Sequence, residues 1–166
     1  DMIIAGIETT VAYLEWTMSL FVRNPQIANK LHEEIEYVVG KHSLETESDL
    51  GRMEYLQCVV KQSLGLYPLV PLSAPHESTE VCGVGWFILP KKTRLLVNVW
   101  VIGRDPVAWE YSWTFKPKRF MGKDIDIEGR NFNILPFGAG RRGFPRALMG
   151  HRLLELMFAQ LMHCFY

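Results

Sequence analysis

The first candidate functional residues of this sequence lie in a glycine-rich segment near the C-terminal end. Residues 136–145 read Pro-Phe-Gly-Ala-Gly-Arg-Arg-Gly-Phe-Pro, and an apolar helical pattern follows directly. Three glycines and two arginines ahead of a helix could cradle an anion, because the first amide groups of a helix favour negative charge. No Gly-Lys-Ser/Thr follows and no strand–helix–strand unit surrounds the segment, so it is neither a Walker loop nor a dinucleotide fingerprint.

A second candidate lies near the other end, where an acid precedes an alcohol at Glu8 and Thr9. Such a pair can relay protons when it lies within reach of a reacting oxygen. The same residues can instead serve the helix, with Glu8 paired elsewhere and Thr9 bonded back to a carbonyl. From the pair alone, the helical interpretation is favoured.

Cysteine and histidine offer little further chemistry. Cys58, Cys82 and Cys164 are odd in number and irregular in spacing, which predicts three free thiols in a reducing compartment and no zinc site. Three histidines are expected at the surface or at helix ends, and three tryptophans are expected to anchor core and loops: His32, His42, His163, Trp100, Trp109 and Trp113.

Composition excludes several classes of protein. The 166 residues carry 18 basic and 18 acidic side chains, and 48% are hydrophobic, which predicts a folded rather than a disordered chain. The balanced charge gives no basic stripe for nucleic acid and no polybasic membrane patch. Residues 2–22 are apolar, but Glu8 and Glu15 interrupt them, which favours a buried helix over a membrane span.

The first half of the chain reads as helices. One helix is expected over residues 1–23, and a second begins with Asn24 as N-cap and Pro25 in its first turn. Apolar residues spaced by three and four continue that second helix until Gly40 stops it. After a polar linker over residues 41–49, a third helix is expected from about Met53 to Tyr67.

The second half changes character. Residues 81–89 and 93–100 are rich in β-branched and aromatic side chains, and residues 90–92 between them predict a hairpin. A short helical turn is expected at Arg104-Asp105-Pro106, and residues 111–145 read as irregular loop. The last helix, from about Arg146 to Phe165, is apolar nearly all round and is therefore expected to be buried.

Four segments, in this order, resemble motifs of the cytochrome P-450 family, most closely its plant microsomal type, and the resemblance covers essentially the whole chain. Residues 5–10 (Ala-Gly-Ile-Glu-Thr-Thr) resemble the motif of the long helix that crosses the haem. Residues 61–68 stand at the family's Glu-x-x-Arg helix, and residues 115–120 resemble its Pro-Glu-Arg-Phe segment. Residues 137–146 resemble the haem-binding loop, Phe-x-x-Gly-x-Arg-x-Cys-x-Gly.

This resemblance implies a mostly α fold (α+β): long helices, one small antiparallel hairpin and a long haem-binding loop. Residues 1–166 would form a single partial domain, the C-terminal portion of the family's domain, with its membrane anchor, early helices and final strands outside the chain. By resemblance, Glu8 and Thr9 would relay protons. Cofactor contacts would come from seven further residues: Ala5, Gly6, His76, Phe137, Gly138, Gly140 and Arg142.

The haem-binding loop departs from the family at its two closing positions. Phe144 stands where the family has its cysteine, and Arg146 replaces the final glycine. The family's iron is held by a thiolate, and a phenyl ring has no lone pair to donate. His151 lies two helical turns further on, about 10 Å along the axis, so it is not expected to substitute. No metal ligand is therefore assigned.

The Glu-x-x-Arg helix departs as well, because Gln62 and Gly65 replace its two charged residues. In the family these residues form a buried network with the arginine that corresponds to Arg119. Losing one side of a buried ion pair costs about 3–5 kcal/mol, and glycine inside a helix costs about 1 kcal/mol relative to alanine. A weakened core is therefore expected.

Three functions remain open. The resemblance implies a haem-thiolate monooxygenase that oxidises small hydrophobic molecules with electrons from an NADPH-dependent reductase, on the cytosolic face of the endoplasmic reticulum membrane. Phe144 instead favours a non-catalytic remnant, inactive as it stands and without thiolate-bound haem. The chain contains no expected membrane segment and would be cytoplasmic if made as it is. An interaction module without haem is the third alternative, for which an exposed apolar patch would be the feature to find.

Overall fold

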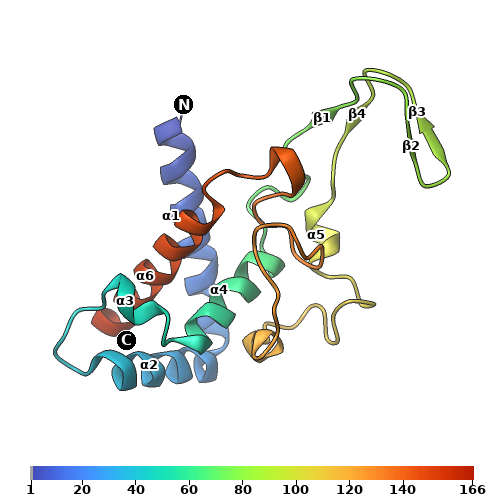
Figure 1. The fold of residues 1–166 in the computed structure, drawn as a ribbon. Helices are drawn as coiled ribbons and strands as arrows, with labels where there is room; N and C mark the ends of the chain where they lie inside the picture. Colours follow the sequence, from blue (N-terminus) through green and yellow to red (C-terminus); the bar gives the residue numbers. More distant parts are fainter. Residues whose placement is uncertain (1) are drawn as a thin grey trace.

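A computed structural model describes residues 2–166, with side chains from residue 6 onward. Four of its helices are long or central to the core: α1 (Met2–Arg23), α2 (Pro25–Val39), α4 (Glu54–Leu66) and α6 (Ala147–Phe165). They pack together at one end of the molecule, and a thin arm of strands projects from the other (Figure 1). Asp1, where the first helix was expected to begin, lies outside the described residues.

The junction of α1 and α2 differs from its prediction in one detail. Pro25 does occupy the first turn of α2, but the Asn24 side chain makes no capping bond there. Its amide nitrogen donates instead to the carbonyl of Leu20, 2.8 Å away, and so satisfies an acceptor at the end of α1. Gly40 ends α2 as predicted, with a φ of 86° that favours glycine.

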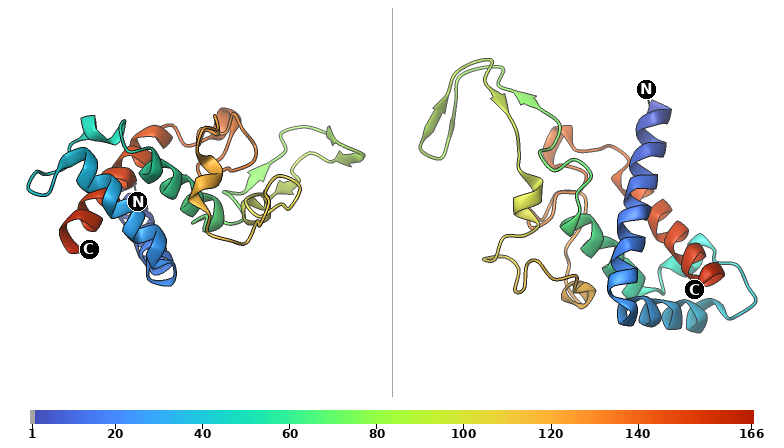
Figure 2. Two further views of the ribbon diagram at one scale, coloured as in Figure 1. Left: turned by 90° about the horizontal axis from the view of Figure 1, so that it is seen from below. Right: turned by 180° about the vertical axis from the view of Figure 1, so that it is seen from behind.

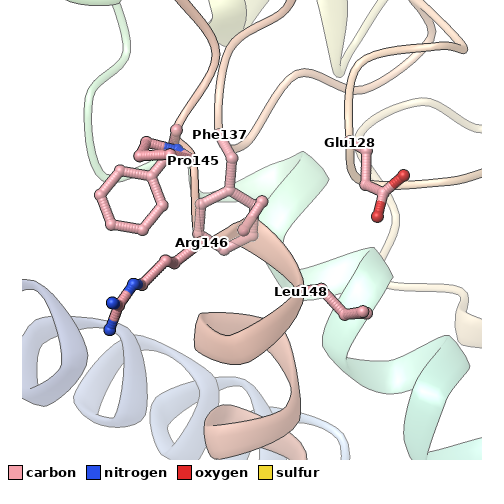
Figure 3. A pocket seen from close by; sticks show the side chains of 7 residues that line it. Glu128, Phe137, Pro145, Arg146 and Leu148 are labelled. Atoms are coloured by element: carbon pink, nitrogen blue, oxygen red, sulfur yellow. The ribbon is translucent and has the colours of Figure 1, made fainter.

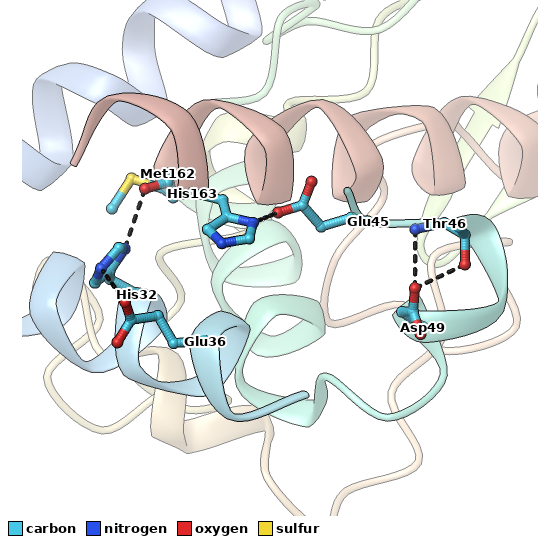
Figure 4. Close-up of polar contacts among 7 residues, drawn as sticks. All are labelled: His32, Glu36, Glu45, Thr46, Asp49, Met162 and His163. Carbon is cyan, nitrogen blue, oxygen red and sulfur yellow. Dashed lines mark hydrogen bonds and ion pairs between the residues drawn. The ribbon is translucent and has the colours of Figure 1, made fainter. Parts of the chain in front are cut away.

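The segment predicted to be a polar linker contains a short helix, α3 (Glu47–Leu50), opened by a capping box between Thr46 and Asp49. Just before it, the buried side chain of Glu45 bonds to His163 near the end of α6 (Figure 4). His163 lies in the last turn of α6, which agrees with the expectation of a surface or helix-end position, and its side chain is only 9% exposed.

Helix α6 contacts α1, α2, α3 and α4, and its residues Phe158, Ala159 and Met162 are fully buried. It is not buried on all sides, as its composition had predicted, because Leu148, Met149 and Leu153 are exposed. Apolar periodicity all round a helix indicates burial only when neighbouring chain covers every face.

The strands pair differently from the predicted hairpin. Strand β2 (Cys82–Val84) turns at Gly85 and pairs with β3 (Phe87–Leu89), whereas β1 (His76–Glu77) pairs with β4 (Arg94–Leu95). Gly85, with a φ of 57°, permits a two-residue turn inside the run that had been interpreted as one strand. Trp100, expected in a strand, lies in the short helix α5 (Val99–Ile102).

The arm that these strands form buries very little. None of residues 67–98 is classed as buried, and Trp86 at the turn is 98% exposed. The arm stands away from the helices in all three views of the chain (Figures 1 and 2). Strands β1 to β4 therefore bury no side chain in the core formed by the helices, whereas Tyr67 and Leu69, just after α4, are partly buried and pack against it.

Residues 111–145 are largely irregular, as predicted, and so are residues 103–110 before them. The turn expected at Arg104-Asp105-Pro106 is present, because the amides of Ala108 and Trp109 bond to the Asp105 carbonyl. Two 3₁₀ turns interrupt the loop, at Pro117–Phe120 and Gly140–Arg142. The loop also supplies core residues: Trp109, Phe115, Phe120, Ile125, Ile127 and Ile134.

The architecture is thus mostly α, with two small two-stranded antiparallel sheets where one had been expected. Among residues 2–166, no helix combines the length and the hydropathy needed to cross a lipid bilayer. The long loop, with α1 and α6 beside it, positions the residues singled out by the sequence.

Candidate functional site

The loop before α6 has a defined backbone. Gly138 and Gly140 adopt φ values of 75° and 66°, which L side chains rarely accept. The Phe144 amide donates to the Phe137 carbonyl at 2.8 Å and closes the loop on itself. The glycines expected as cofactor contacts therefore have a structural reason to be glycine, independent of any ligand.

Phe144 lies at the surface of this loop. Its ring stacks on that of Phe137, with centroids 6.0 Å apart and an angle of 26° between the planes, and it is 57% exposed. Phe137 continues inward, because a Cβ at Gly150 of α6 would lie 3.6 Å from its ring. Phe144, which the resemblance would align with the metal ligand, is thus a stacked aromatic ring that faces solvent.

Three arginines surround this ring in the chain, and all are exposed: Arg141, Arg142 and Arg146. A cavity of about 190 Å³ lies at Phe144 and the start of α6, and Glu128 contributes to its wall. Glu128 and Arg146 stand on opposite sides of this cavity (Figure 3), and Glu128 forms an ion pair with Arg130 instead. Glu128 was missed by the sequence reasoning, since nothing in its spacing connects it to the loop.

Gly129 packs directly against the glycine-rich loop before α6. A Cβ at Gly129 would lie 2.5 Å from the Gly138 carbonyl oxygen and 2.7 Å from the Ala139 side chain. The backbone of Gly129 also has a φ of 81°. Only glycine fits this contact, which explains how residues 128–130 come to lie against the glycine-rich loop.

The candidates on α1 lie on an exposed stretch of helix. Gly6, Glu8 and Thr9 are all exposed, and the Glu8 carboxylate forms no hydrogen bond or ion pair with another described residue. The Thr10 hydroxyl donates to the Gly6 carbonyl at 2.7 Å. Ala5 belongs to α1, but its side chain lies outside the described part of the chain.

His76, expected as a second cofactor contact, lies in β1 opposite Leu95 of β4 and is exposed. It is on the arm, whereas Arg142 is in the loop before α6. The two cations expected to share one cofactor therefore come from separate parts of the molecule, and neither makes a hydrogen bond or ion pair with the other.

Helix α4 carries the two replaced motif positions in its buried interior. The side-chain oxygen of Gln62 is buried without a hydrogen-bond partner among the described residues. A Cβ at Gly65 would lie 3.0 Å from a methyl group of Ile134, and a Cβ at Gly103 would collide with the Gly65 carbonyl. Helix α4 is thus in close contact with the long loop at Gly65, through the backbone of Gly103 and the methyl group of Ile134.

Arg119 does not lack partners, although no carboxylate binds it. Its guanidinium donates to the carbonyls of Tyr111 and Thr114, at 2.8 and 2.9 Å, and more weakly to that of Lys116 at 3.3 Å. Burial lowers the pKa of Arg119, and Glu110 opposes that effect. The cost expected for an unpartnered buried arginine is reduced, because its own loop supplies the acceptors.

A buried polar cluster lies between α1, α4 and α6. Glu155 is fully buried and lies 3.3 Å from His151, with Arg152 at 2.8 Å from its other oxygen. Burial lowers the pKa of His151 to about 4 and raises the pKa of Glu155. His151 thus packs along α6 as a neutral core residue.

These residues do not assemble a metal centre. Among residues 2–166, no group of three or more His, Cys, Asp or Glu side chains is placed to hold a metal ion. Cys58 is buried in α4, Cys82 lies in β2, and Cys164 is near the end of α6. None of the three belongs to the loop that contains Phe144.

Comparison with known proteins places the whole chain in one family. The family model for cytochrome P450 matches residues 1–165. Cytochrome P450 98A1 of Sorghum bicolor is 44% identical over 165 residues, and cytochrome P450 750A1 of Pinus taeda is 47% identical over 171. The drimenol monooxygenase of Persicaria hydropiper is 42% identical over 168 residues. The alignments cover 99% of this chain and 32–33% of these relatives, so the chain spans about a third of their length.

Solved structures agree with the sequence relatives. A zebra fish cytochrome P450 bound to abiraterone matches 96% of this chain and 36% of its own, with a TM-score of 0.86 and 30% identity. A zebra fish cytochrome P450 structure with progesterone matches 98% of this chain and 37% of its own. Its TM-score is 0.89 and its sequence identity is 29%. A family model over nearly every residue, with this structural agreement, shows that the chain belongs to the cytochrome P450 family.

Proposed function

We propose that this chain carries the haem-facing framework of a cytochrome P450 but does not act as a monooxygenase in its present form. The observation that carries the proposal is Phe144, an exposed phenyl ring at the motif position of the axial cysteine. For the longer proteins it resembles, we propose oxidation of small hydrophobic molecules, with electrons from an NADPH-dependent reductase at the endoplasmic reticulum membrane.

Haem is the cofactor of the family, and a thiolate ligand supplies the electron density that favours oxygen–oxygen bond cleavage. The residues of this loop do not fit a haem held in that way. Phe144 stacks on Phe137 and offers no lone pair, and the three cysteines lie in other elements. His151 does not substitute, because it is buried against Glu155 within α6. No reaction step through haem is derived for this chain.

Two replaced positions in α4 also support this proposal. Gln62 leaves an unpartnered buried oxygen where the family has a carboxylate, and Gly65 has no side chain to bind one. Arg119 has turned to backbone carbonyls of its own loop. The network that supports the family's loop is thus replaced by backbone contacts.

The remaining motif residues are proposed as inherited positions. Glu8 and Thr9 correspond to the proton relay. Arg142 and His76 correspond to contacts with the cofactor's carboxylates, and the glycines of the loop permit close approach of a flat ligand. For the third alternative, the arm offers exposed apolar residues such as Trp86 and Phe87. The chain spans about a third of the length of its relatives, so this exposure by itself adds no support to an interaction module.

A carbon monoxide difference spectrum tests the proposal. The purified chain, mixed with haem, reduced and exposed to carbon monoxide, should lack the red-shifted Soret band of thiolate-bound haem. Observing that band with the unaltered chain would overturn the proposal.

A second experiment tests whether a cysteine at position 144 restores the band of thiolate-bound haem. Residues 132–146 are placed in a full-length relative, where the band should be absent and should return in the Phe144→Cys variant. A Phe132→Cys variant is the matched control, because Phe132 is 68% exposed in the same long loop and should restore nothing. If Phe144→Cys restores no band, the assignment of Phe144 to the axial position is wrong.

A further inference from the structure

The connection between α2 and α4 is attached to the core through a carboxylate. Of residues 41–49, only Glu45 is buried, and its side chain is 0% exposed. The adjacent Leu44 is 74% exposed, although burial of an apolar side chain would be the more favourable choice. Burying a charge instead costs free energy that only a well-placed partner can recover. The contact of this connection with the helices therefore depends on what Glu45 meets there.

Glu45 meets His163 in the last turn of α6. One carboxylate oxygen, Oε1, is bonded to the Nδ1 atom of His163, whose side chain is itself largely buried (Figure 4). The other oxygen, Oε2, is buried and has no hydrogen-bond partner among the described residues. Removing the imidazole would leave a buried carboxylate without a partner, which is costlier than replacing both groups by apolar ones.

The connection has little structure of its own to hold it in place. Its helix α3 is a single turn, closed by the capping box between Thr46 and Asp49, and a helix this short is unstable in water by itself. Gly40, with a φ of 86°, provides a bend at one end, and the fully buried Leu50 anchors the other. Between these two ends, Glu45 is the only buried residue.

We propose that residues 41–49 form a strap that opens and closes over α6 while the long helices stay folded, and that the bond between Glu45 and His163 is its latch. In the closed state Glu45 is buried and α3 is formed. In the open state Glu45 is hydrated and α3 melts, because its single turn has lost the contact that supports it. Such local opening requires less free energy than global unfolding, since few buried groups become exposed.

Native-state amide hydrogen exchange of the full chain, followed by mass spectrometry in urea below the unfolding transition, tests for this opening. The Thr46 amide donates to the Asp49 carboxylate and the Asp49 amide to the Thr46 carbonyl, at 2.9 and 3.0 Å, so both are protected only while the strap is closed. Exchange of residues 41–50 should depend little on urea. Exchange of residues 154–162 in α6 should accelerate steeply, because global unfolding exposes far more surface.

Variants test the latch. His163→Leu should bring exchange of residues 41–50 to within about tenfold of an unstructured peptide, while residues 154–162 stay protected by at least about a hundredfold. The double variant Glu45→Leu/His163→Leu should restore most of the strap's protection, because an apolar pair leaves no buried charge unpaired. Glu47→Gln is the matched control, because Glu47 is an exposed carboxylate of the same strap, and it should change exchange by less than about twofold.

Three results would overturn the inference. Equal urea dependence of residues 41–50 and 154–162 would show that the strap opens only when the whole chain unfolds. Full protection of the strap in His163→Leu, or loss of protection in α6 as well, would show that the bond is not a local latch. A double variant as unprotected as His163→Leu would exclude the unpaired carboxylate as the cause of opening. None of these measurements involves haem, so they are independent of the carbon monoxide spectrum that tests the proposed function.

Discussion

The three cysteines differ sharply in their surroundings. Cys58 is buried in α4, whereas Cys82 and Cys164 are exposed. Burial raises the pKa of the Cys58 thiol to about 11, and Glu54 adds to this effect. The thiolate is the reactive form, so Cys58 should be inert while the protein is folded.

Thiol titration should therefore find two fast cysteines in the native chain and three after unfolding in urea. A Cys58→Ala variant should keep both fast thiols and lose only the one that appears on unfolding. Rapid modification of all three native thiols would contradict the buried position of Cys58.

Single residues also show where sequence reasoning found the position but not its environment. Arg119 was correctly expected to lack a carboxylate, but three carbonyl groups of residues 111–116 accept its hydrogen bonds. Backbone acceptors leave no trace in a list of side chains. The prediction of a weakened core at this residue was therefore overstated.

At the scale of elements, α4 is stabilised at its first turn by a side chain from elsewhere. Met53 cannot cap it, and Glu34 of α2 accepts the amides of Tyr55 and Leu56 at 2.7 and 2.8 Å. A carboxylate at a helix N-terminus also suits the helix dipole. Burial raises the pKa of Glu34, and these two amides oppose the shift.

Replacing Glu34 by alanine should lower the free energy of unfolding by about 1 kcal/mol, because two amides lose their acceptor. Urea denaturation measures the change. Glu33→Ala is the matched control, since Glu33 lies in the same helix but is exposed, and it should have little effect. Equal effects of the two substitutions would show that Glu34 does not cap α4.

The other end of α4 is bound by Arg104. Its guanidinium bonds to the Leu66 carbonyl and lies over the ring of Trp100, 4.1 Å from the centroid. Trp16 of α1 stacks on Tyr67 beside this contact. Tertiary contacts therefore fix both ends of the helix that carries Gln62 and Gly65.

At the scale of the whole molecule, α6 connects the other helices, so a titrating group within it affects global stability. Burial lowers the pKa of His151 from 6.5 to about 4, and Lys61 and Arg152 act in the same direction. Between pH 6.5 and 4, His151 is therefore protonated in the unfolded chain but neutral in the folded chain. The stability that neutral His151 confers is present above pH 6.5 and is lost as pH falls toward 4.

Comparing the chain with His151→Gln by urea denaturation across this range should reveal the effect. The unaltered chain should lose on the order of 3 kcal/mol more than the variant between pH 6.5 and 4. Glu155, whose pKa burial raises, acts in the opposite direction and is present in both proteins. His42→Gln, at an exposed site, should leave the profile unchanged. Parallel profiles for all three would refute the assignment.

The sequence alone located the long helices, the glycine-rich loop and the order of four motifs, because apolar spacing and glycine punctuation are local properties of the chain. It also assigned Phe144 to the motif position of the axial cysteine, and this assignment, which depends only on register within one motif, stays a prediction. The sequence did not predict which strands pair with each other. The choice between pairing Arg94–Leu95 with residues 87–89 or with His76–Glu77 depends on long-range contacts rather than on propensity.

Tertiary structure decided the environment of each of these residues. It placed Glu34 and Arg104 at the two ends of α4, buried Glu155 beside His151, and gave Arg119 its carbonyl partners. It also left Phe144 exposed and stacked on Phe137. The sequence determines which residue stands at each position, but burial and hydrogen-bond partners arise only when segments distant in sequence pack together.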